Sequence, residues 1–302
     1  HDRKAFRVIC SGLEFFFFVS LRSMSLTIAT WNVNSIRRRH DGLARLVAKA
    51  DPDVICLQET KVTDDLFPRH EVETLGFSHF LCHGMKAYNG VAILSKLPLI
   101  SPETMNCPET MNRNAAGDCR HVCATVDAGG DLGEIEIHSL YIPAGGDIPN
   151  AEKNAKFAHK LHFLDAVTRF WAERKKRNSH MVVAGDLNVA PLATDVWSHQ
   201  RLKYVVTHTA IEIDRLHRMR EAAAWVDAIR HFVADSERLF TWWSYRTADW
   251  SVADKGRRLD HVWVTPGLVR ALKNAIVLRE ARGWPAPSDH VPVIVTLETL
   301  DS

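Results

Sequence analysis

The chain has 302 residues, of which 46% are hydrophobic and 25% charged, and its formal net charge is +2. This composition excludes a disordered chain and a fibrous repeat. The small net charge excludes strong attraction of a polyanion by overall charge alone, so nucleic-acid binding would need local basic clusters or bound cations. Six cysteines without a Cys-x-x-Cys pair favour reduced thiols in a cytoplasmic protein over a disulfide framework.

Residues 1–23 are predicted to be an extension outside the fold, disordered or derived from an upstream reading frame. The apolar run at 14–19 is too short to span a bilayer, and no small-residue cleavage site follows it. A degenerate targeting segment is the alternative. Residues 24–302 are predicted to form a single domain, because no linker or internal repeat divides them. A monomer is expected, because the fold forms one closed core and the site needs no second chain.

The domain is predicted to begin with a strand over 26–32, a helix over 41–50 and a second strand over 54–57. The first strand ends at Asn32, and the second is followed directly by Gln-Glu-Thr-Lys, which contains Glu59. Polar side chains at the carboxyl ends of buried strands indicate a functional site, since α/β sheets place their sites there.

The middle of the chain is predicted to be mostly β, with turns at Asn89-Gly90 and Gly129-Gly130. Tyr141 follows the last of these strands, and a long amphipathic helix is predicted over 150–176. The predicted strands cover residues 77–82, 90–95, 121–126 and 135–140.

The stretch from His180 to Asn188 is an apolar strand that ends in glycine and is followed by Asp186 and Asn188. Side chains two apart on an extended backbone point the same way, so this acid and this amide can converge on one ligand. A carboxylate beside an amide suits a divalent cation or a phosphate. By itself the motif is more typical of an Asx turn that closes a buried strand.

A helix is predicted over 211–232, and paired tryptophans follow at Trp242 and Trp243. Further on, a strand over 257–264 contains Asp260. Asp289 and His290 precede a last strand over 291–297. Each feature alone has an ordinary structural explanation, such as a helix cap, an ion pair or a core aromatic pair.

Together and in this order, the motifs resemble the exonuclease III family of the endonuclease/exonuclease/phosphatase superfamily. The matching segments are Trp31-Asn32-Val33-Asn34-Ser35-Ile36-Arg37, Leu57-Gln58-Glu59-Thr60-Lys61, Gly90-Val91-Ala92-Ile93-Leu94, Tyr141-Ile142-Pro143-Ala144-Gly145, Gly185-Asp186-Leu187-Asn188, Arg258-Leu259-Asp260-His261 and Pro287-Ser288-Asp289-His290.

The resemblance implies an α/β fold of the DNase I type, a two-sheet β-sandwich flanked by helices in four layers. It implies Mg²⁺-dependent hydrolysis of DNA phosphodiesters, with Mn²⁺ able to substitute. The implied reactions are incision 5′ to abasic sites and 3′-to-5′ exonuclease action, so the partner is double-stranded DNA with abasic sites or 3′ ends, and no membrane.

The resemblance implies a role for each residue that matches the family's motifs. Asp186 resembles the water-activating acid and Asn188 the phosphate-contacting amide, although Tyr141 and Asp186 can exchange proton roles. His290 resembles a phosphate-contacting imidazole that Asp260 orients, and Tyr141 a phenol at the phosphate or leaving group. Glu59 resembles the principal metal ligand, and the implied metal-binding set is Asn32, Glu59, Asp186, Asn188, Asp289 and His290.

The implied DNA-binding residues are three arginines, three aromatic residues and one asparagine. The basic run is equally typical of a solvated helix start, and the tryptophans of a core pair. One departure concerns Arg257, which stands where the family pattern leads us to expect an apolar residue and leaves the fit of an abasic pocket open. The set is Asn34, Arg37, Arg38, Tyr141, Trp242, Trp243 and Arg258.

Two other functions compete with a DNA-repair nuclease. One is a superfamily relative that acts on RNA or another phosphoester, and the other is a non-catalytic nucleic-acid-binding relative. The Gln-Glu-Thr-Lys and Tyr-x-Pro-x-Gly stretches favour the DNA branch, and the presence of every expected acid favours catalysis.

Overall fold

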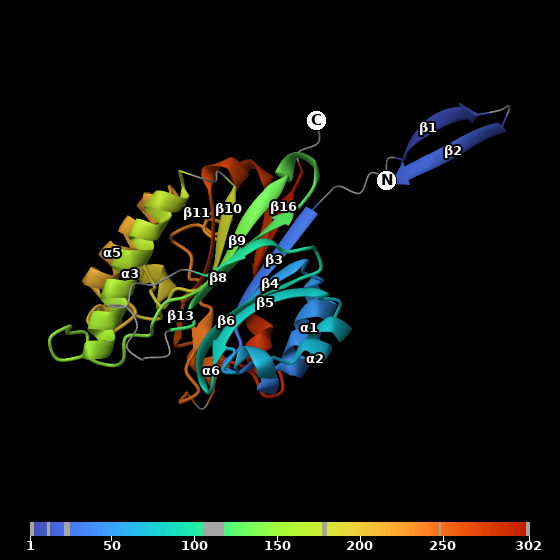
Figure 1. The fold of residues 1–302 in the computed structure, drawn as a ribbon. Coiled ribbons are helices and arrows are strands. Elements are labelled where there is room, and N and C mark those ends of the chain that lie inside the picture. The colour runs from blue at the N-terminus through green and yellow to red at the C-terminus, as the bar shows by residue number, and fades with distance from the viewer. Residues whose placement is uncertain are drawn as a thin grey trace.

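The computed structural model describes residues 3–10, 13–20, 25–104, 118–176, 180–247 and 249–299. In this part of the chain, two six-stranded sheets lie face to face with helices on their outer faces (Figure 1). The predicted four-layer sandwich is confirmed. None of the helices in the described residues has the length and apolar character to cross a membrane.

The N-terminal segment, predicted to be disordered or derived from an upstream reading frame, contains two strands. β1 (Arg3–Cys10) pairs antiparallel with β2 (Leu13–Ser20), and this hairpin joins neither six-stranded sheet. Figure 1 shows the hairpin apart from the packed sheets. The expectation that residues 1–23 lie outside the domain stays a prediction.

The first sheet has the order β15-β16-β3-β4-β6-β5. Helices α1 (His40–Ala50) and α2 (Arg69–Thr74) cover its outer face, where Trp31, Leu43 and Ile55 are buried. Its strands are β3 (Ser25–Asn32), β4 (Val54–Gln58), β5 (His79–Met85), β6 (Tyr88–Ser95), β15 (Leu272–Val277) and β16 (Val293–Glu298).

The second sheet has the order β11-β14-β10-β9-β8-β7, and helices α3 (Ala155–Arg174) and α5 (Ala210–Ala222) cover it. A short pair, β12 (Trp242–Trp243) and β13 (Gly256–Arg257), lies outside both sheets. The strands of the sheet are β7 (Ile100–Glu103), β8 (His121–Asp127), β9 (Glu134–Tyr141), β10 (Met181–Asp186), β11 (Val226–Asp227) and β14 (Asp260–Val264). The short helix α4 (His199–Leu202) follows β10, and the short helix α6 (Trp250–Ala253) lies between β12 and β13.

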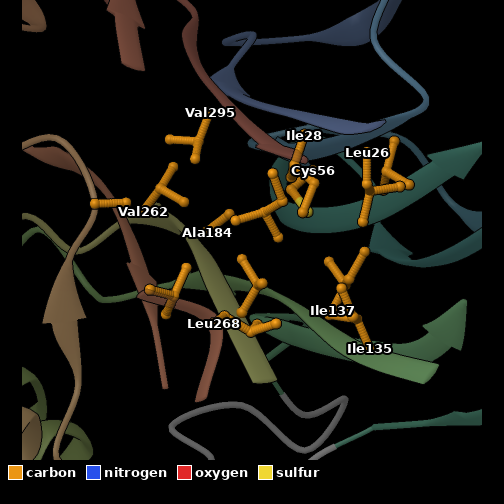
Figure 2. Close-up of a cluster of buried hydrophobic side chains, with 14 of the residues drawn as sticks. Leu26, Ile28, Cys56, Ile135, Ile137, Ala184, Val262, Leu268 and Val295 are labelled. Carbon is orange, nitrogen blue, oxygen red and sulfur yellow. The ribbon is translucent and has the colours of Figure 1, made fainter. Parts of the chain in front are cut away.

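The main core fills the space between the sheets (Figure 2). On β3, Leu26 and Ile28 belong to this core, whereas Ala29 and Trp31 belong to the cluster under the helices. This alternation follows from the two-residue period of a strand that is covered on both faces. The sandwich therefore fixes which side chains remain available at the strand ends.

Strand direction brings the candidate residues to one edge. β3 runs parallel to β4, and β9 runs parallel to β10, so in each sheet two carboxyl ends lie together. β14 is antiparallel to β10 and begins at the same edge, where Asp186 pairs with Tyr141 on one side and with Asp260 on the other.

Several predicted boundaries were wrong. The helix expected over 211–232 ends at Ala222, because Ala224 adopts a left-handed conformation (φ 54°) and β11 then pairs with β14. The helix expected from 150 begins at Ala155 after the side-chain cap of Asn154. Asn89-Gly90 lies inside β6, and the hairpin turns at residues 86–87 instead. Strands β7 and β15 were not predicted.

We predict that Gly185→Ala destabilises the protein strongly. A Cβ at this position would lie 1.8 Å from the backbone oxygen of Leu140, so β10 and β9 could not keep their pairing. We expect a loss of at least about 3 kcal/mol, because backbone cannot move aside as a side chain can.

Thermal or urea unfolding measures the change. Gly283→Ala is the matched control, since its nearest neighbour would be 3.9 Å away and no strain is expected. Equal stability of the two variants would contradict the prediction.

Candidate active site

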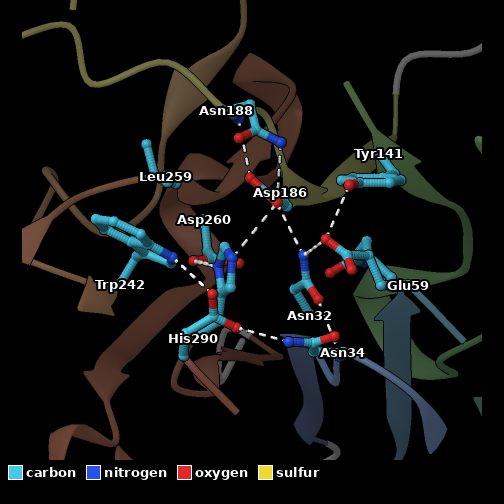
Figure 3. Close-up of polar contacts among 12 residues, drawn as sticks. Asn32, Asn34, Glu59, Tyr141, Asp186, Asn188, Trp242, Leu259, Asp260 and His290 are labelled. Carbon is cyan, nitrogen blue, oxygen red and sulfur yellow. Dashed lines mark hydrogen bonds and ion pairs between the residues drawn. The ribbon is translucent and has the colours of Figure 1, made fainter. Parts of the chain in front are cut away.

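Asp186 is the centre of the candidate site. It lies at the end of β10 with 1% of its surface exposed. Asn32, from the end of β3 in the other sheet, donates from Nδ2 to Asp186 Oδ2 at 2.9 Å and to Glu59 Oε1 at 3.0 Å (Figure 3). Acids from both sheets are therefore joined through one buried amide.

Asn188 supports Asp186 from the following turn. Its backbone N–H donates to Asp186 Oδ1 at 3.0 Å, and its Nδ2 donates to Oδ2 at 3.0 Å. Burial raises the pKa of Asp186 to about 7, although nearby His290 acts in the opposite direction. A carboxyl group that titrates near neutral pH suits proton transfer in that range.

His290 and Asp260 form a buried pair. His290 Nδ1 lies 2.8 Å from Asp260 Oδ2, and its Nε2 lies 3.7 Å from Asp186 Oδ2. Burial would lower the pKa of His290, but the carboxylates of Asp260 and Asp186 raise it to about 10. His290 is therefore an imidazolium at neutral pH, with Nδ1 directed to Asp260 and Nε2 toward Asp186.

Thr241 completes this pair, and sequence reasoning missed it. Its Oγ1 donates to Asp260 Oδ2 at 2.6 Å and accepts the backbone N–H groups of Leu259 and Asp260, both at 3.0 Å. No local motif marked it, because its contacts come from a strand nearly twenty residues further along the chain.

Glu59, Tyr141 and Lys61 form the opposite side of the site. Tyr141 donates from its hydroxyl to Glu59 Oε1 at 2.8 Å, and Lys61 Nζ lies 2.7 Å from Glu59 Oε2. Burial opposes ionisation of Glu59, but Lys61 and the bond from Asn32 lower its pKa. Burial and Glu59 raise the pKa of Tyr141 well above its usual value. The phenol is thus a neutral hydrogen-bond donor.

Asp289 lies at the rim of the same site. Asn34 Nδ2 donates to its Oδ1 at 3.2 Å, and Trp242 Nε1 donates to its Oδ2 at 3.0 Å. Asp289, Glu59 and Asp186 line one cleft of about 570 Å³. These acids therefore face a shared volume that opens to solvent.

The donor set of this cleft fits a hard divalent cation. Glu59 and Asp289 offer the carboxylate oxygens that such a cation prefers. A cationic group already occupies this side of the cleft, since Lys61 Nζ lies 2.6 Å from Asn34 Oδ1 and also contacts Glu59. Asn32 turns Nδ2 to the acids while its Oδ1 accepts from the backbone N–H of Asn34, so direct ligation by Asn32 would require its amide to rotate.

A second group of possible ligands lies elsewhere in the described residues, at His121, Cys123 and His138. Its donor atoms are engaged with protein. His121 Nε2 lies 2.9 Å from His138 Nδ1, and His138 Nε2 lies 2.7 Å from Glu136 Oε1. The Arg174 guanidinium also binds Glu136 there and disfavours a metal cation.

The predicted DNA-binding residues divide into exposed and buried sets. Arg37 and Arg38 are exposed, and Trp242 is half-buried on the cleft. Trp243 is 1% exposed, and its Nε1 donates to Asp254 Oδ1 at 2.9 Å. The sequence left open which of the two tryptophans meets DNA. Alternate strand residues face opposite ways, and Trp243 is the one that faces the interior.

Arg258 is wrongly assigned to DNA. Its side chain is fully buried and binds Asp227, and Asp195 Oδ2 lies 3.5 Å from its Nη1. A buried guanidinium needs carboxylate partners, and these two acids supply them from distant segments. Arg258 therefore supports the strand that carries Asp260.

Lys160 and Glu212 form a further buried pair that the sequence analysis missed. Lys160 Nζ lies 2.5 Å from Glu212 Oε1 and donates to the backbone oxygen of Asn188 at 2.7 Å. Asn188 has a left-handed backbone (φ 53°), so this ammonium helps to hold its turn. The available signal was a lysine between Phe157 and Leu164 on the apolar face of α3.

We predict that His261 makes stability depend on pH. Burial lowers its pKa to about 3, whereas the ordinary value is 6.5. Between these values the unfolded chain binds one proton more at this residue. Its stabilising effect is therefore complete above about pH 6.5 and falls as the pH drops, by up to about 1.4 kcal/mol per unit.

Urea unfolding of the wild type and of His261→Gln between pH 7 and pH 4 measures this effect. The free energy of unfolding should fall less steeply for the variant. Identical slopes would show that His261 does not titrate as its burial requires.

Comparisons with known proteins agree with this geometry. The profile of the Endonuclease/Exonuclease/phosphatase family matches residues 29–290. Exodeoxyribonuclease III of Haemophilus influenzae is 25% identical over 280 residues, which cover 87% of this chain and 97% of that protein.

Solved structures are similar over the same region. A 3′ phosphatase from Neisseria, bound to a product DNA hairpin, has a TM-score of 0.81 and 28% identity, covering 91% of this chain and 100% of that one. An AP endonuclease from Archaeoglobus fulgidus has a TM-score of 0.78 and 29% identity, covering 91% and 100%.

Proposed function

This chain belongs to the endonuclease/exonuclease/phosphatase family, within its exonuclease III and AP endonuclease branch, and on that basis we propose that it is a DNA-repair nuclease. It hydrolyses phosphodiesters 5′ to abasic sites and removes nucleotides from 3′ ends of duplex DNA. The observation that carries the proposal is the joining of Glu59 and Asp186 by Asn32, beside the protonated His290.

The residues divide the chemistry among them. Asp186 takes a proton from the attacking water, because its pKa lies near neutral pH. The His290 imidazolium, held by Asp260, stabilises the negative charge that develops on the phosphoryl oxygens. Tyr141 donates a hydrogen bond to the phosphate or the leaving oxygen.

Glu59 and Asp289 are the residues that would hold Mg²⁺, or Mn²⁺ in its place. The bound metal would supply positive charge to the phosphate and to the leaving oxygen. Arg37 and Arg38, exposed beside β3, contact DNA phosphates, and Trp242 meets the sugar at the cleft. The protein acts as a monomer in the cytoplasm.

We predict that Asp186→Asn and His290→Asn each lower turnover of a duplex with one abasic-site analogue by about a hundredfold or more. Asp186→Asn removes the proton acceptor, and His290→Asn removes the cation that opposes the developing charge. The assay uses a labelled duplex with saturating Mg²⁺ and with EDTA, beside an intact duplex and single-stranded RNA.

Asp214→Asn is the matched control, since it removes an exposed carboxylate on α5 whose partner is Arg218. Near-normal turnover by both site variants would contradict the assigned roles. Cleavage of RNA alone would move the chain to another branch of the family.

We also predict that Mg²⁺ raises the melting temperature of the wild type but not that of Glu59→Gln. A ligand that binds only the folded state stabilises it in proportion to its occupancy, and the neutral amide of the variant would lack the carboxylate charge that attracts the metal. Differential scanning fluorimetry over a range of Mg²⁺ concentrations measures this. Equal shifts for both proteins would place the metal elsewhere.

A further inference from the structure

Lys160 and Glu212 form an ion pair that joins the two helices covering the second sheet. Lys160 belongs to α3 and Glu212 to α5, and both side chains are 0% exposed. The roles assigned above use neither residue. Burying a charged pair is costly unless its remaining hydrogen-bonding groups are also satisfied, so the other partners of the pair show what it supports.

Lys160 holds two segments that line the catalytic cleft. Its Nζ donates to Asn188 O at 2.7 Å and to Ala144 O at 3.4 Å besides its contact with Glu212, and both oxygens belong to residues that line the cleft. An ammonium has three N–H donors, so all of them are used. The lysine stem packs just as closely, since an added Cβ on Gly145 would lie 2.9 Å from Lys160 Cδ.

Glu212 holds a third segment of the cleft. Its Oε1 and Oε2 each accept the backbone N–H of Thr207 at 3.0 Å, and its Oε2 accepts the Thr209 hydroxyl at 2.6 Å. Thr207 lines the cleft, and its backbone oxygen accepts from the N–H of Ala190 at 2.7 Å. This segment is thereby tied to the turn after Asp186, so the ion pair joins all three segments.

The turn after Asp186 is where this ion pair meets the catalytic groups. Asn188 has a left-handed backbone (φ 53°), a conformation less favourable than the right-handed one, so it needs neighbours that hold it. Its N–H and its Nδ2 both donate to Asp186 (Figure 3). The bond from Lys160 to Asn188 O therefore helps to set where the carboxylate of Asp186 lies.

We propose that Lys160 and Glu212 are positioning residues for the hydrolysis, because they hold three cleft-lining segments in place around Asp186. This inference rests on the proposed nuclease function. Neither side chain lines the cleft, so neither contributes contacts to bound DNA. Misplacement of the reacting groups slows the chemical step, so we expect the pair to act on kcat and not on KM.

The test replaces both side chains in the double variant Lys160→Met/Glu212→Met. Apolar side chains of similar size often replace a buried ion pair without loss of stability, but methionine neither donates to Asn188 O nor accepts from Thr207. On a duplex with one abasic-site analogue, kcat should fall about tenfold or more and KM should stay within about threefold. Each kcat is expressed per folded molecule, from circular dichroism at the assay temperature.

Asp165→Asn/Arg215→Gln is the matched control. It removes an ion pair of 3.1 Å between the same two helices, and neither of its residues lines the cleft. Its kcat should stay within about twofold of the wild-type value. Equal losses of kcat in the control and in the double variant would overturn the proposal, because loosened helix packing would then explain both.

Amide hydrogen exchange gives a readout that needs no catalysis. Residues 144–146, 187–190 and 205–209 should exchange faster in the double variant than in the wild type or the control. Should the double variant not fold, Glu212→Gln, which keeps the shape of the side chain and loses its charge, should lower kcat and raise exchange in the same segments.

A fall in kcat together with faster exchange in these segments would support the proposal. Wild-type kcat in the double variant, or in Glu212→Gln where only that variant folds, would overturn it and leave the nuclease function intact. A fall in kcat without faster exchange would also overturn it, since the segments would then not have been released. Wild-type protein that cuts no duplex would refute the nuclease function and this inference together.

Discussion

The hydrogen bond from Asn32 to Asp186 connects the two sheets at the edge where the site forms. Asp186 is almost fully buried, so its charge must be met by neighbours and not by water. Asn32, Asn188 and His290 do this, and each comes from a different segment. The chemistry of the site therefore depends on how the sheets are packed together.

That packing also sets the protonation states. Burial raises the pKa of Asp186, and the acids around His290 raise the pKa of the imidazole. The result is a carboxyl group with a pKa of about 7 beside an imidazole with a pKa of about 10. Outside the sandwich, where water would screen these groups, neither property would arise.

The strand ends could be predicted from sequence because each one is a local pattern, an apolar run followed by a polar turn. Residues such as Arg258 and Thr241 could not, since their partners come from remote parts of the chain. The sequence left open which of Trp242 and Trp243 meets DNA, because two adjacent aromatic residues give no indication of which faces inward. The boundary at Ala222 depended on pairing between β11 and β14, which no local propensity encodes.

Arg257 and Arg258 also show what the sequence alone could not predict. The two arginines are adjacent, yet Arg258 is fully buried with acidic partners, whereas Arg257 lines the cleft and donates from Nη1 to Val206 O and Thr207 Oγ1. In the sequence pattern, both are simply basic residues. Only the fold distinguishes a guanidinium that supports a strand from one that lines the cleft.

The most direct measurement is the anomalous scattering of crystals soaked in Mn²⁺. A manganese peak within coordination distance of the carboxylates of Glu59 and Asp289 is the expected result. A peak at His121, Cys123 and His138 instead, or no peak at saturating Mn²⁺, would contradict the assignment of this cleft as the metal-dependent active site.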